Sequence, residues 1–247
     1  MKVLDKSATL PENIGKGKCN HIGQQKENES AGEFIKRASK DLLGQASDDE
    51  KEKILNLSNS EKLKMINNRE NLDILINDKN WEVRREIAKQ SYGLDELIND
   101  ESLYVRAEVA KRGYGLDKLI NDEDWYVRAA VAGQGYGLDK LVCDENWRVR
   151  VAVAERGYGL GNFINDNDPD VRKIVAKQGY GLDKLVNDDD WRVRKVVAEQ
   201  GYGLKKLVDD KDVDVRIAVA KQGYGLDKLI NDKNQNVRKI AIEKFKN

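Results

Sequence analysis

Apolar residues along most of the chain have the spacing of short amphipathic helices. In residues 122–143, Val127, Val131 and Ala132 lie at i, i+4 and i+5 and so form one stripe of a helix. A second apolar group follows within residues 138–142. This second segment is too short for a stable isolated α-helix, and it predicts a single 3₁₀ or α-helical turn. The unit is therefore expected to contain a longer helix followed by a short one.

This unit recurs eight times with a constant step of 22 residues. Each copy has a Val-Arg dipeptide in the longer helix, an aspartate before that helix and, in seven copies, a tyrosine after it. The arginines are Arg84, Arg106, Arg128, Arg150, Arg172, Arg194, Arg216 and Arg238. The aspartates are Asp78, Asp100, Asp122, Asp144, Asp166, Asp188, Asp210 and Asp232. The tyrosines are Tyr92, Tyr114, Tyr136, Tyr158, Tyr180, Tyr202 and Tyr224.

Short polar residues precede the longer helices and are expected to cap them. Asp124 precedes Trp125 in the third copy, and the equivalent positions hold Asn, Asp or Ser, whose side chains accept hydrogen bonds from free N–H groups at a helix start. In the fifth copy Pro169 follows the cap, at the helical position that proline prefers. A Gly-Tyr-Gly corner follows most of the helices. Its first glycine, Gly135 in the third copy, can adopt the left-handed conformation that ends a helix.

Neither helix of a unit can bury its apolar stripe alone, so neighbouring units are expected to stack into a solenoid. The helical spacing disfavours a β-solenoid, and the lack of a recurring L-x-x-L-x-L segment disfavours a leucine-rich repeat. The expected fold is all-α: an α-solenoid in which α-helices alternate with short, 3₁₀-like helices, preceded by a helical N-terminal cap.

The segment D-x-(D/N)-W-x-V-R-x-x-V-A, seen at Asp122–Ala132 and Asp188–Ala198, resembles the helix of HEAT-like repeats. The short period and the short second helix resemble the leucine-rich repeat variant family more closely. This resemblance covers residues 70–247 and implies a right-handed superhelix of alternating α and 3₁₀ helices. The chain departs from the family where Gly-Tyr-Gly-Leu-Asp replaces a Pro-rich segment. Some members have an N-terminal cysteine cluster for an iron–sulfur centre, whereas only Cys19 is present here, so that cofactor is not expected.

The chain is expected to have three segments. Residues 1–29 show little apolar periodicity and predict a flexible N-terminal tail. Residues 30–69 predict a helical cap with a degenerate repeat, in which Met65 occupies a core valine position. Ser-x-x-Glu capping boxes begin at Ser30, Ser47 and Ser58. Residues 70–247 form the predicted solenoid.

The overall charge favours no anionic partner. The chain has 44 basic and 44 acidic residues, and this formal net charge of zero argues against a general affinity for nucleic acid or an anionic membrane. No apolar run approaches the roughly 18 residues of a membrane span. Residues 1–19 lack the apolar core of a signal peptide, and a cytoplasmic location is expected.

The arginine and aspartate columns are expected to be structural. An Arg–carboxylate pair suits a repeated, partly buried joint, either within one repeat or between neighbours. A phosphate-binding arginine stripe is the alternative interpretation. The tyrosine column is expected to pack between successive turns with its hydroxyls in water, and a stacking platform for bases is its alternative.

The start of each longer helix is the best candidate for a binding surface. That position holds Trp81, Leu103, Trp125, Trp147, Pro169, Trp191, Val213 and Gln235, so the fold does not require an aromatic residue there. Exposed aromatic residues and arginines are typical of protein interfaces, although these residues could instead cover the edge of the core. The predicted partner-binding residues are Tyr104, Trp125, Tyr126, Trp147, Arg148, Trp191 and Arg192.

The sequence contains no recognisable catalytic or metal-binding constellation. Cys19 and His21 are too few ligands for a zinc site, and Cys143 has no nearby histidine to activate it. The G-x-x-x-x-G-K-[ST] phosphate loop is absent. A catalytic acid is needed once, whereas the aspartate recurs in every copy. We therefore expect no enzyme activity, no cofactor and no bound metal.

Variable positions at fixed spacing on an extended surface suit a non-enzymatic protein–protein interaction module, such as a scaffold, adaptor or inhibitor. The expected partner is a protein or an extended peptide, and the chain itself is expected to be a monomer. Nucleic-acid binding by a HEAT-like repeat protein is the alternative, and it requires a basic stripe despite the balanced charge. A hydrolase or metalloenzyme is the least supported class, and no membrane partner is expected.

Overall fold

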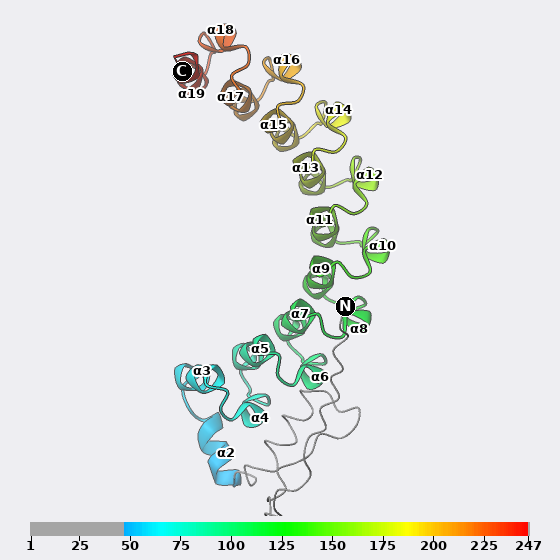
Figure 1. The fold of residues 1–247 in the computed structure, drawn as a ribbon, viewed down its shortest axis with the longest axis vertical. Helices are drawn as coiled ribbons and strands as arrows, with labels where there is room; N and C mark the ends of the chain where they lie inside the picture. Colours follow the sequence, from blue (N-terminus) through cyan, green and yellow to red (C-terminus); the bar gives the residue numbers. More distant parts are fainter. Residues whose placement is uncertain (1–46, 247) are drawn as a thin grey trace, which may run out of the picture. The chain divides into compact units, whose positions relative to one another are not determined.

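A computed structural model of the chain describes residues 47–246. All regular elements among these residues are helices, labelled α2 to α19 (Figure 1). The chain divides into two units, residues 1–52 and 53–247. Helix α2 spans Asp48–Leu55, and the helices after it belong to the second unit. The predicted tail (1–29) and the first part of the predicted cap (30–46) lie outside the described residues, so those boundaries stay predictions.

Long and short helices alternate from Asn59 onwards, which confirms the predicted repeat. The long helices are α3 (Asn59–Asn67), α5 (Trp81–Lys89), α7 (Leu103–Lys111), α9 (Trp125–Gly133), α11 (Trp147–Glu155), α13 (Pro169–Lys177), α15 (Trp191–Glu199), α17 (Val213–Lys221) and α19 (Gln235–Phe245). The short helices are α4 (Leu72–Leu75), α6 (Leu94–Leu97), α8 (Leu116–Leu119), α10 (Leu138–Leu141), α12 (Leu160–Phe163), α14 (Leu182–Leu185), α16 (Leu204–Leu207) and α18 (Leu226–Leu229).

Polar caps begin the long helices, as the sequence predicts. Asp124 lies in extended backbone, and its carboxylate accepts a hydrogen bond from the N–H of Tyr126 at 2.7 Å. Ser102 is an exception, since its side chain makes no capping bond. The capping box of Ser58 and Glu61 is complete at the start of α3. The same bond as at Asp124 is made by Asn80, Asn146, Asp168, Asp190, Asp212 and Asn234.

Each short helix is a single helical turn, as the sequence predicts. In α10 the N–H of Leu141 donates to the carbonyl of Gly137 at 3.0 Å, and the N–H of Val142 donates to that of Leu138 at 2.9 Å. Both bonds span four residues, as in an α-helix, whereas the N–H of Lys140 donates to the carbonyl of Gly137 across three residues at 3.1 Å, as in a 3₁₀ turn. Gly137 has a φ of +59° and precedes the turn.

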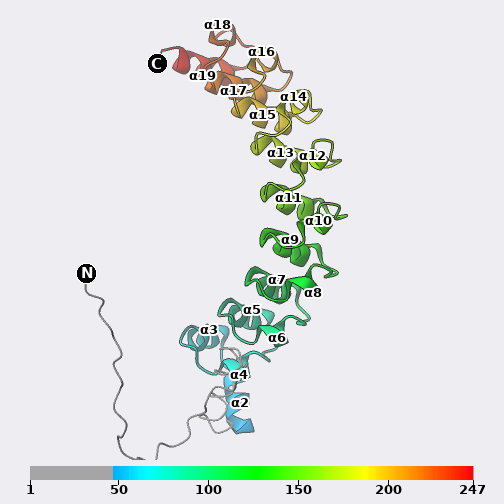
Figure 2. The same ribbon diagram turned by 45° about the vertical axis from the view of Figure 1, so that its right-hand side comes forward.

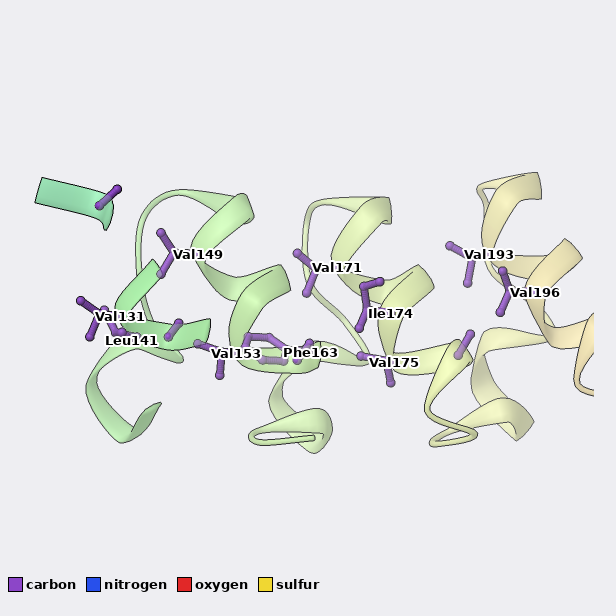
Figure 3. Packing of buried hydrophobic residues seen from close by; sticks show 14 of the residues in the cluster. Val131, Leu141, Val149, Val153, Phe163, Val171, Ile174, Val175, Val193 and Val196 are labelled. Atoms are coloured by element: carbon purple, nitrogen blue, oxygen red, sulfur yellow. The ribbon is translucent and has the colours of Figure 1, made fainter. Parts of the chain in front are cut away.

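A continuous hydrophobic core lies between the long and the short helices (Figure 3). In the fourth copy Val149 and Val153 of α11 point inward toward Phe163 of α12. Phe163 replaces the leucine of other copies and is 2 % exposed. The valines that precede the repeated arginines are all fully buried: Val83, Val105, Val127, Val149, Val171, Val193, Val215 and Val237. Because each layer shares this core with the next, stacking buries the stripes that one unit leaves open.

Within the second unit the two sets of helices form neighbouring rows that follow an arc (Figures 1 and 2). The long helices line the inner side of the arc, and the short helices line the outer side. Each long helix packs against the long helices before and after it. Equivalent positions of successive repeats therefore lie side by side along the array, which is the α-solenoid that the sequence predicts.

Candidate functional site

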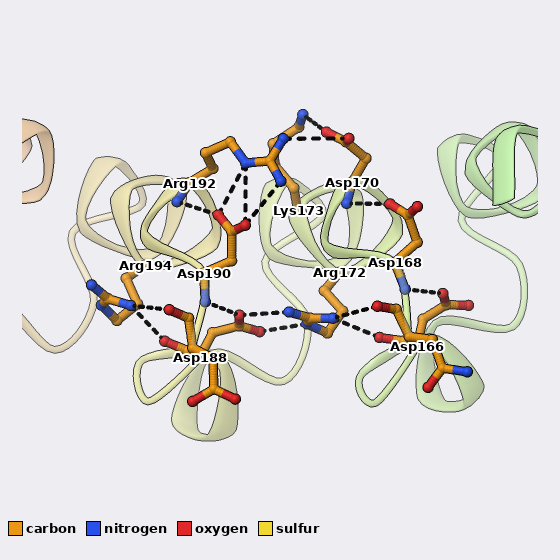
Figure 4. A network of polar contacts seen from close by, with 11 residues as sticks. Asp166, Asp168, Asp170, Arg172, Lys173, Asp188, Asp190, Arg192 and Arg194 are labelled. Atoms are coloured by element: carbon orange, nitrogen blue, oxygen red, sulfur yellow. Dashed lines mark hydrogen bonds and ion pairs between the residues drawn. The ribbon is translucent and has the colours of Figure 1, made fainter. Parts of the chain in front are cut away.

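Seven buried arginine–aspartate pairs, which we call the Arg–Asp ladder, join successive repeats. Arg150 donates from Nε and Nη2 to the carboxylate of Asp166 at 2.7 and 2.8 Å, and Asp166 belongs to the next repeat. Its Nη1 donates to the carbonyl of Asp144 in its own repeat at 2.8 Å. Figure 4 shows the same arrangement around Arg172 and Asp188. The pairs are Arg84–Asp100, Arg106–Asp122, Arg128–Asp144, Arg150–Asp166, Arg172–Asp188, Arg194–Asp210 and Arg216–Asp232.

The ladder is a structural joint and offers no phosphate site. The hydrogen bond from Arg216 lowers the pKa of Asp232, and the same bond raises the pKa of the Arg216 guanidinium. Both groups therefore stay ionised at neutral pH. Their side chains are only 6 and 8 % exposed, and the guanidinium donates to Asp232, to the carbonyl of Asp210 and to that of Lys211. A bidentate pair with these additional bonds fixes the register of two repeats.

One buried pair of the same kind escaped the sequence analysis. Lys62 in α3 lies 22 residues before Arg84, and its Nζ is 2.6 Å from the Oδ2 of Asp78. Both residues are almost fully buried. The 22-residue step leads from Arg84 back to Lys62, but residues 61–62 are Glu-Lys and so do not match the repeated Val-Arg dipeptide. In the same helix Met65 is only half-buried, and Ile66 is the fully buried residue.

The tyrosines at the corners are half-exposed. Their exposed fractions lie between 39 and 46 % from Tyr114 to Tyr224. The Oη of Tyr180 approaches Gly161 of the preceding short helix, where an added Cβ would be 3.5 Å away. Tyr180 therefore packs against the preceding repeat, which agrees with the predicted packing between successive turns for this tyrosine.

Aromatic rings from α5, α7 and α9 form a continuous surface at the starts of these helices, which we call the aromatic ribbon. The ring of Trp81 stacks on Tyr104 with centroids 4.6 Å apart. Tyr104 meets the edge of Tyr126 at 5.9 Å, and Tyr126 meets Trp125 at 5.7 Å. Tyr104 is 45 % exposed, whereas both tryptophans are half-buried. The rings thus cover the edge of the core and also present aromatic surface to solvent.

Arg148 extends the aromatic ribbon to the fourth copy. Its guanidinium lies 4.9 Å from the ring centroid of Trp125 and 4.3 Å from that of Trp147. Arg148 is exposed and forms no ion pair with any described residue. A cation over two rings is attracted by the negative face of each. The structure therefore brings together five of the predicted residues: Tyr104, Trp125, Tyr126, Trp147 and Arg148.

Two further cations on the aromatic ribbon were missed from the sequence. Arg85 lies 5.3 Å from the ring centroid of Trp81, and Lys111 lies 5.2 Å from that of Tyr126. Lys111 also lies 3.3 Å from the Tyr126 hydroxyl. Arg85 follows Trp81 by one helical turn, so its place was predictable from i, i+4 spacing. The position of Lys111 depends on how the neighbouring helices pack, so it could not be predicted from the sequence.

Trp191 and Arg192 lie two repeats further along and have a different environment. Arg192 donates to the carboxylate of Asp190 at 2.8 Å and lies 3.5 Å from Asp170 (Figure 4). The hydrogen bond from Arg192 lowers the pKa of Asp190. Lys173 forms a second ion pair with Asp170. Arg192 is thus neutralised within the chain, unlike Arg85, Lys111 and Arg148, whereas Lys195 lies 5.9 Å from the ring centroid of Trp191 and forms no ion pair with a described residue.

Metal and membrane sites find no support in the part of the chain that the structure describes. Over residues 47–246 no group of three His, Cys, Asp or Glu side chains is arranged to hold a metal ion. Cys143 is exposed, whereas Cys19 and His21 lie outside the described range. None of the described helices is long and apolar enough to span a bilayer.

No family model matches the chain, and no curated protein is similar to it.

Proposed function

We propose that this chain is a non-enzymatic interaction module, related to the leucine-rich repeat variant and HEAT-like families, that binds a protein or an extended peptide along the starts of its long helices. It acts as a scaffold, adaptor or inhibitor. Its contact residues are Tyr104, Trp125, Tyr126, Trp147 and Arg148, with Trp191 and Arg192 as a second, more distant contact.

The observation that supports this proposal is the aromatic ribbon with its cations. Rings and a guanidinium contact one another without interruption from Trp81 to Trp147. Aromatic residues and arginines dominate the binding energy of protein interfaces because they bury large area with few rotatable bonds. Long helices hold these side chains at fixed spacing, so little conformational entropy is lost when a partner binds.

Charges beside the aromatic ribbon favour a protein over a nucleic acid. Glu101, Glu123 and Glu145 each stand two residues before a long helix, and their side chains are 84, 92 and 89 % exposed. A phosphodiester backbone that followed the ribbon would pass all three carboxylates. Proteins that track single strands instead present a continuous basic groove.

The test is affinity capture from source lysate with the tagged full chain, with and without nuclease, followed by mass spectrometry. We expect a stoichiometric protein that survives nuclease and is lost with the Trp125→Ala, Trp147→Ala double variant. Trp191→Ala removes a side chain of the same size two repeats away from the aromatic ribbon and should weaken capture less. Capture that disappears with nuclease would overturn the proposal in favour of nucleic-acid binding.

A further inference from the structure

One arginine of the repeated column has no aspartate partner. Arg238 in α19 donates from Nη1 to the carbonyls of Asp232 at 2.7 Å and Lys233 at 3.1 Å. Every arginine of the Arg–Asp ladder makes the same contact with the carbonyl of its own aspartate. Nε and Nη2 of Arg238 donate to no described residue, whereas the same atoms of Arg216 hold Asp232. Arg238 is therefore anchored like the ladder arginines, and the side of its guanidinium that binds a carboxylate is open.

The same side of α19, which lies at one end of the array (Figure 1), is apolar and exposed. Arg238, Ile242 and Phe245 follow i, i+4, i+7 spacing and so share one side of the helix. Ile242 is 42 % exposed and Phe245 is 63 % exposed. In the seven preceding repeats the position of Ile242 holds a fully buried alanine: Ala88, Ala110, Ala132, Ala154, Ala176, Ala198 and Ala220.

These three residues, Arg238, Ile242 and Phe245, form what we call the end surface. The outer face of a terminal repeat is ordinarily polar, because no further repeat covers it. The fold does not require large apolar residues here, since it accepts alanine at the position of Ile242 and glycine, such as Gly223, at that of Phe245. The end surface thus combines an open guanidinium with two exposed apolar side chains that the fold does not explain.

The ladder shows which chemistry such a surface accepts. Each of its seven aspartates follows a large apolar residue by three positions and Ile or Val by two. Before Asp232 these residues are Leu229 and Ile230. Leu229 is only 1 % exposed, so the apolar residue is buried in the core while the carboxylate binds Arg216. A segment with this pattern can bring both an apolar side chain and a carboxylate to the end surface.

Charge favours such a segment over a second copy of the chain. Residues 233–246 contain five basic residues and one acidic residue. The acid, Glu243, follows Arg238 by five positions and so lies on another side of the helix. Two of these basic ends would repel each other. A copy stacked head to tail would instead present Asn56, the counterpart of Asp78 one repeat earlier, and its side chain is uncharged.

We propose that the end surface binds a segment of a partner protein in which an aspartate closely follows two apolar residues. The carboxylate accepts hydrogen bonds from Nε and Nη2 of Arg238, and the apolar side chains pack on Ile242 and Phe245. A bidentate pair fixes the position of the segment, and covering it with apolar side chains strengthens its hydrogen bonds. The aromatic ribbon lies on α5 to α11, so this second site shares no residue with it.

The experiment selects randomised twelve-residue peptides, displayed on phage, against the full chain and discards those that also bind the Arg238→Gln variant. We expect the remaining peptides to contain Asp with apolar residues two and three positions before it. A synthetic peptide of the enriched sequence should bind Arg238→Lys about tenfold more weakly, because lysine keeps the charge but lacks the two-pronged donor. Lys239→Gln removes the adjacent exposed charge and should change the affinity by less than about twofold.

Two further substitutions leave the anchor of Arg238 intact. Replacing the peptide's aspartate with asparagine should weaken binding to the unmodified chain about tenfold and cause little further loss with Arg238→Lys. Ile242→Ala introduces the residue that the inner repeats have and should also weaken binding.

Several outcomes would overturn the proposal. They are a failure to recover any peptide that depends on Arg238, enriched peptides without Asp, and equal binding of the asparagine peptide. Displacement of the peptide by an equal concentration of a single-stranded oligonucleotide would assign the end surface to phosphate groups instead. Loss of binding in the Trp125→Ala, Trp147→Ala double variant would place the peptide on the aromatic ribbon, which would overturn the second site while leaving the proposed function intact.

Discussion

Arg128 contacts two carboxylates that differ in burial. Asp144 is 7 % exposed at its side chain and accepts bonds from Nε and Nη2 of Arg128 at 2.7 and 3.0 Å, and from the N–H of Asn146 at 2.9 Å. Glu145 is 89 % exposed and lies 3.7 Å from the same guanidinium. Removing one partner of a buried pair leaves an uncompensated charge, whereas a surface pair is screened by water.

We therefore expect Asp144→Asn to lower the free energy of unfolding by about 3 kcal/mol. Glu145→Gln is the matched control at the same arginine and should lower it by less than about 1 kcal/mol. Urea unfolding at pH 7, followed by circular dichroism, measures both. Equal losses would contradict the assignment of the joint to the buried partner.

At the residue scale, sequence predicts which side chains recur but not which atoms they reach. The columns of Arg and Asp were evident, yet the pairing of Arg150 with the following repeat needed the stacking geometry. The cations of the aromatic ribbon show the same limit, because Lys111 of α7 reaches the ring of Tyr126 on the neighbouring long helix, α9. Arg192 was grouped with Arg148 by its column, and only the structure reveals the carboxylates of Asp190 and Asp170 beside it.

Among the elements, the corner between a long and a short helix contains two glycines with different requirements. Gly201 has a φ of +75°, and a Cβ there would meet nothing within 4 Å. Gly203 has a φ of +63°, and a Cβ there would overlap Cγ2 of Val186. Val186 is buried and β-branched, so it has few alternative rotamers.

Gly201→Ala should therefore cost about 1 kcal/mol through its left-handed backbone alone. Gly203→Ala should cost about 3 kcal/mol, since overpacking adds to the same backbone cost. Thermal melting of the two variants compares them directly. If Gly203→Ala melted no lower than Gly201→Ala, the contact with Val186 would not restrict the corner.

Element boundaries followed from caps and corners that have clear sequence signals, such as Asp124 and Gly135. The sequence leaves the short helices open as 3₁₀ or α turns, and bonds of both kinds occur together in α10. Serine at position 91 illustrates another limit. Ser91 adopts a φ of +56° where later repeats have glycine, so the conformation is set by the repeat rather than by the residue.

The whole array is held together by contacts between neighbours. Each long helix packs on the one before and the one after, and the ladder likewise joins only adjacent repeats. The stability of such an array is approximately a sum over repeats and their interfaces. Periodicity in the sequence was therefore sufficient to predict the architecture, whereas the binding surface depends on positions that vary between repeats.

This nearest-neighbour organisation predicts local rather than global responses to damage. Val219 in α17 and Val131 in α9 occupy equivalent positions and are both fully buried. Val219→Ala should weaken its repeat by about 2 kcal/mol and accelerate amide hydrogen exchange in α15 to α19, while α5 to α9 keep their protection. Val131→Ala, the matched control, should reverse this distribution and expose α7 to α11. Hydrogen exchange at pH 7, read by mass spectrometry of peptic fragments, resolves the two patterns. Equal loss of protection along the array in both variants would instead mean that the repeats unfold as one cooperative unit.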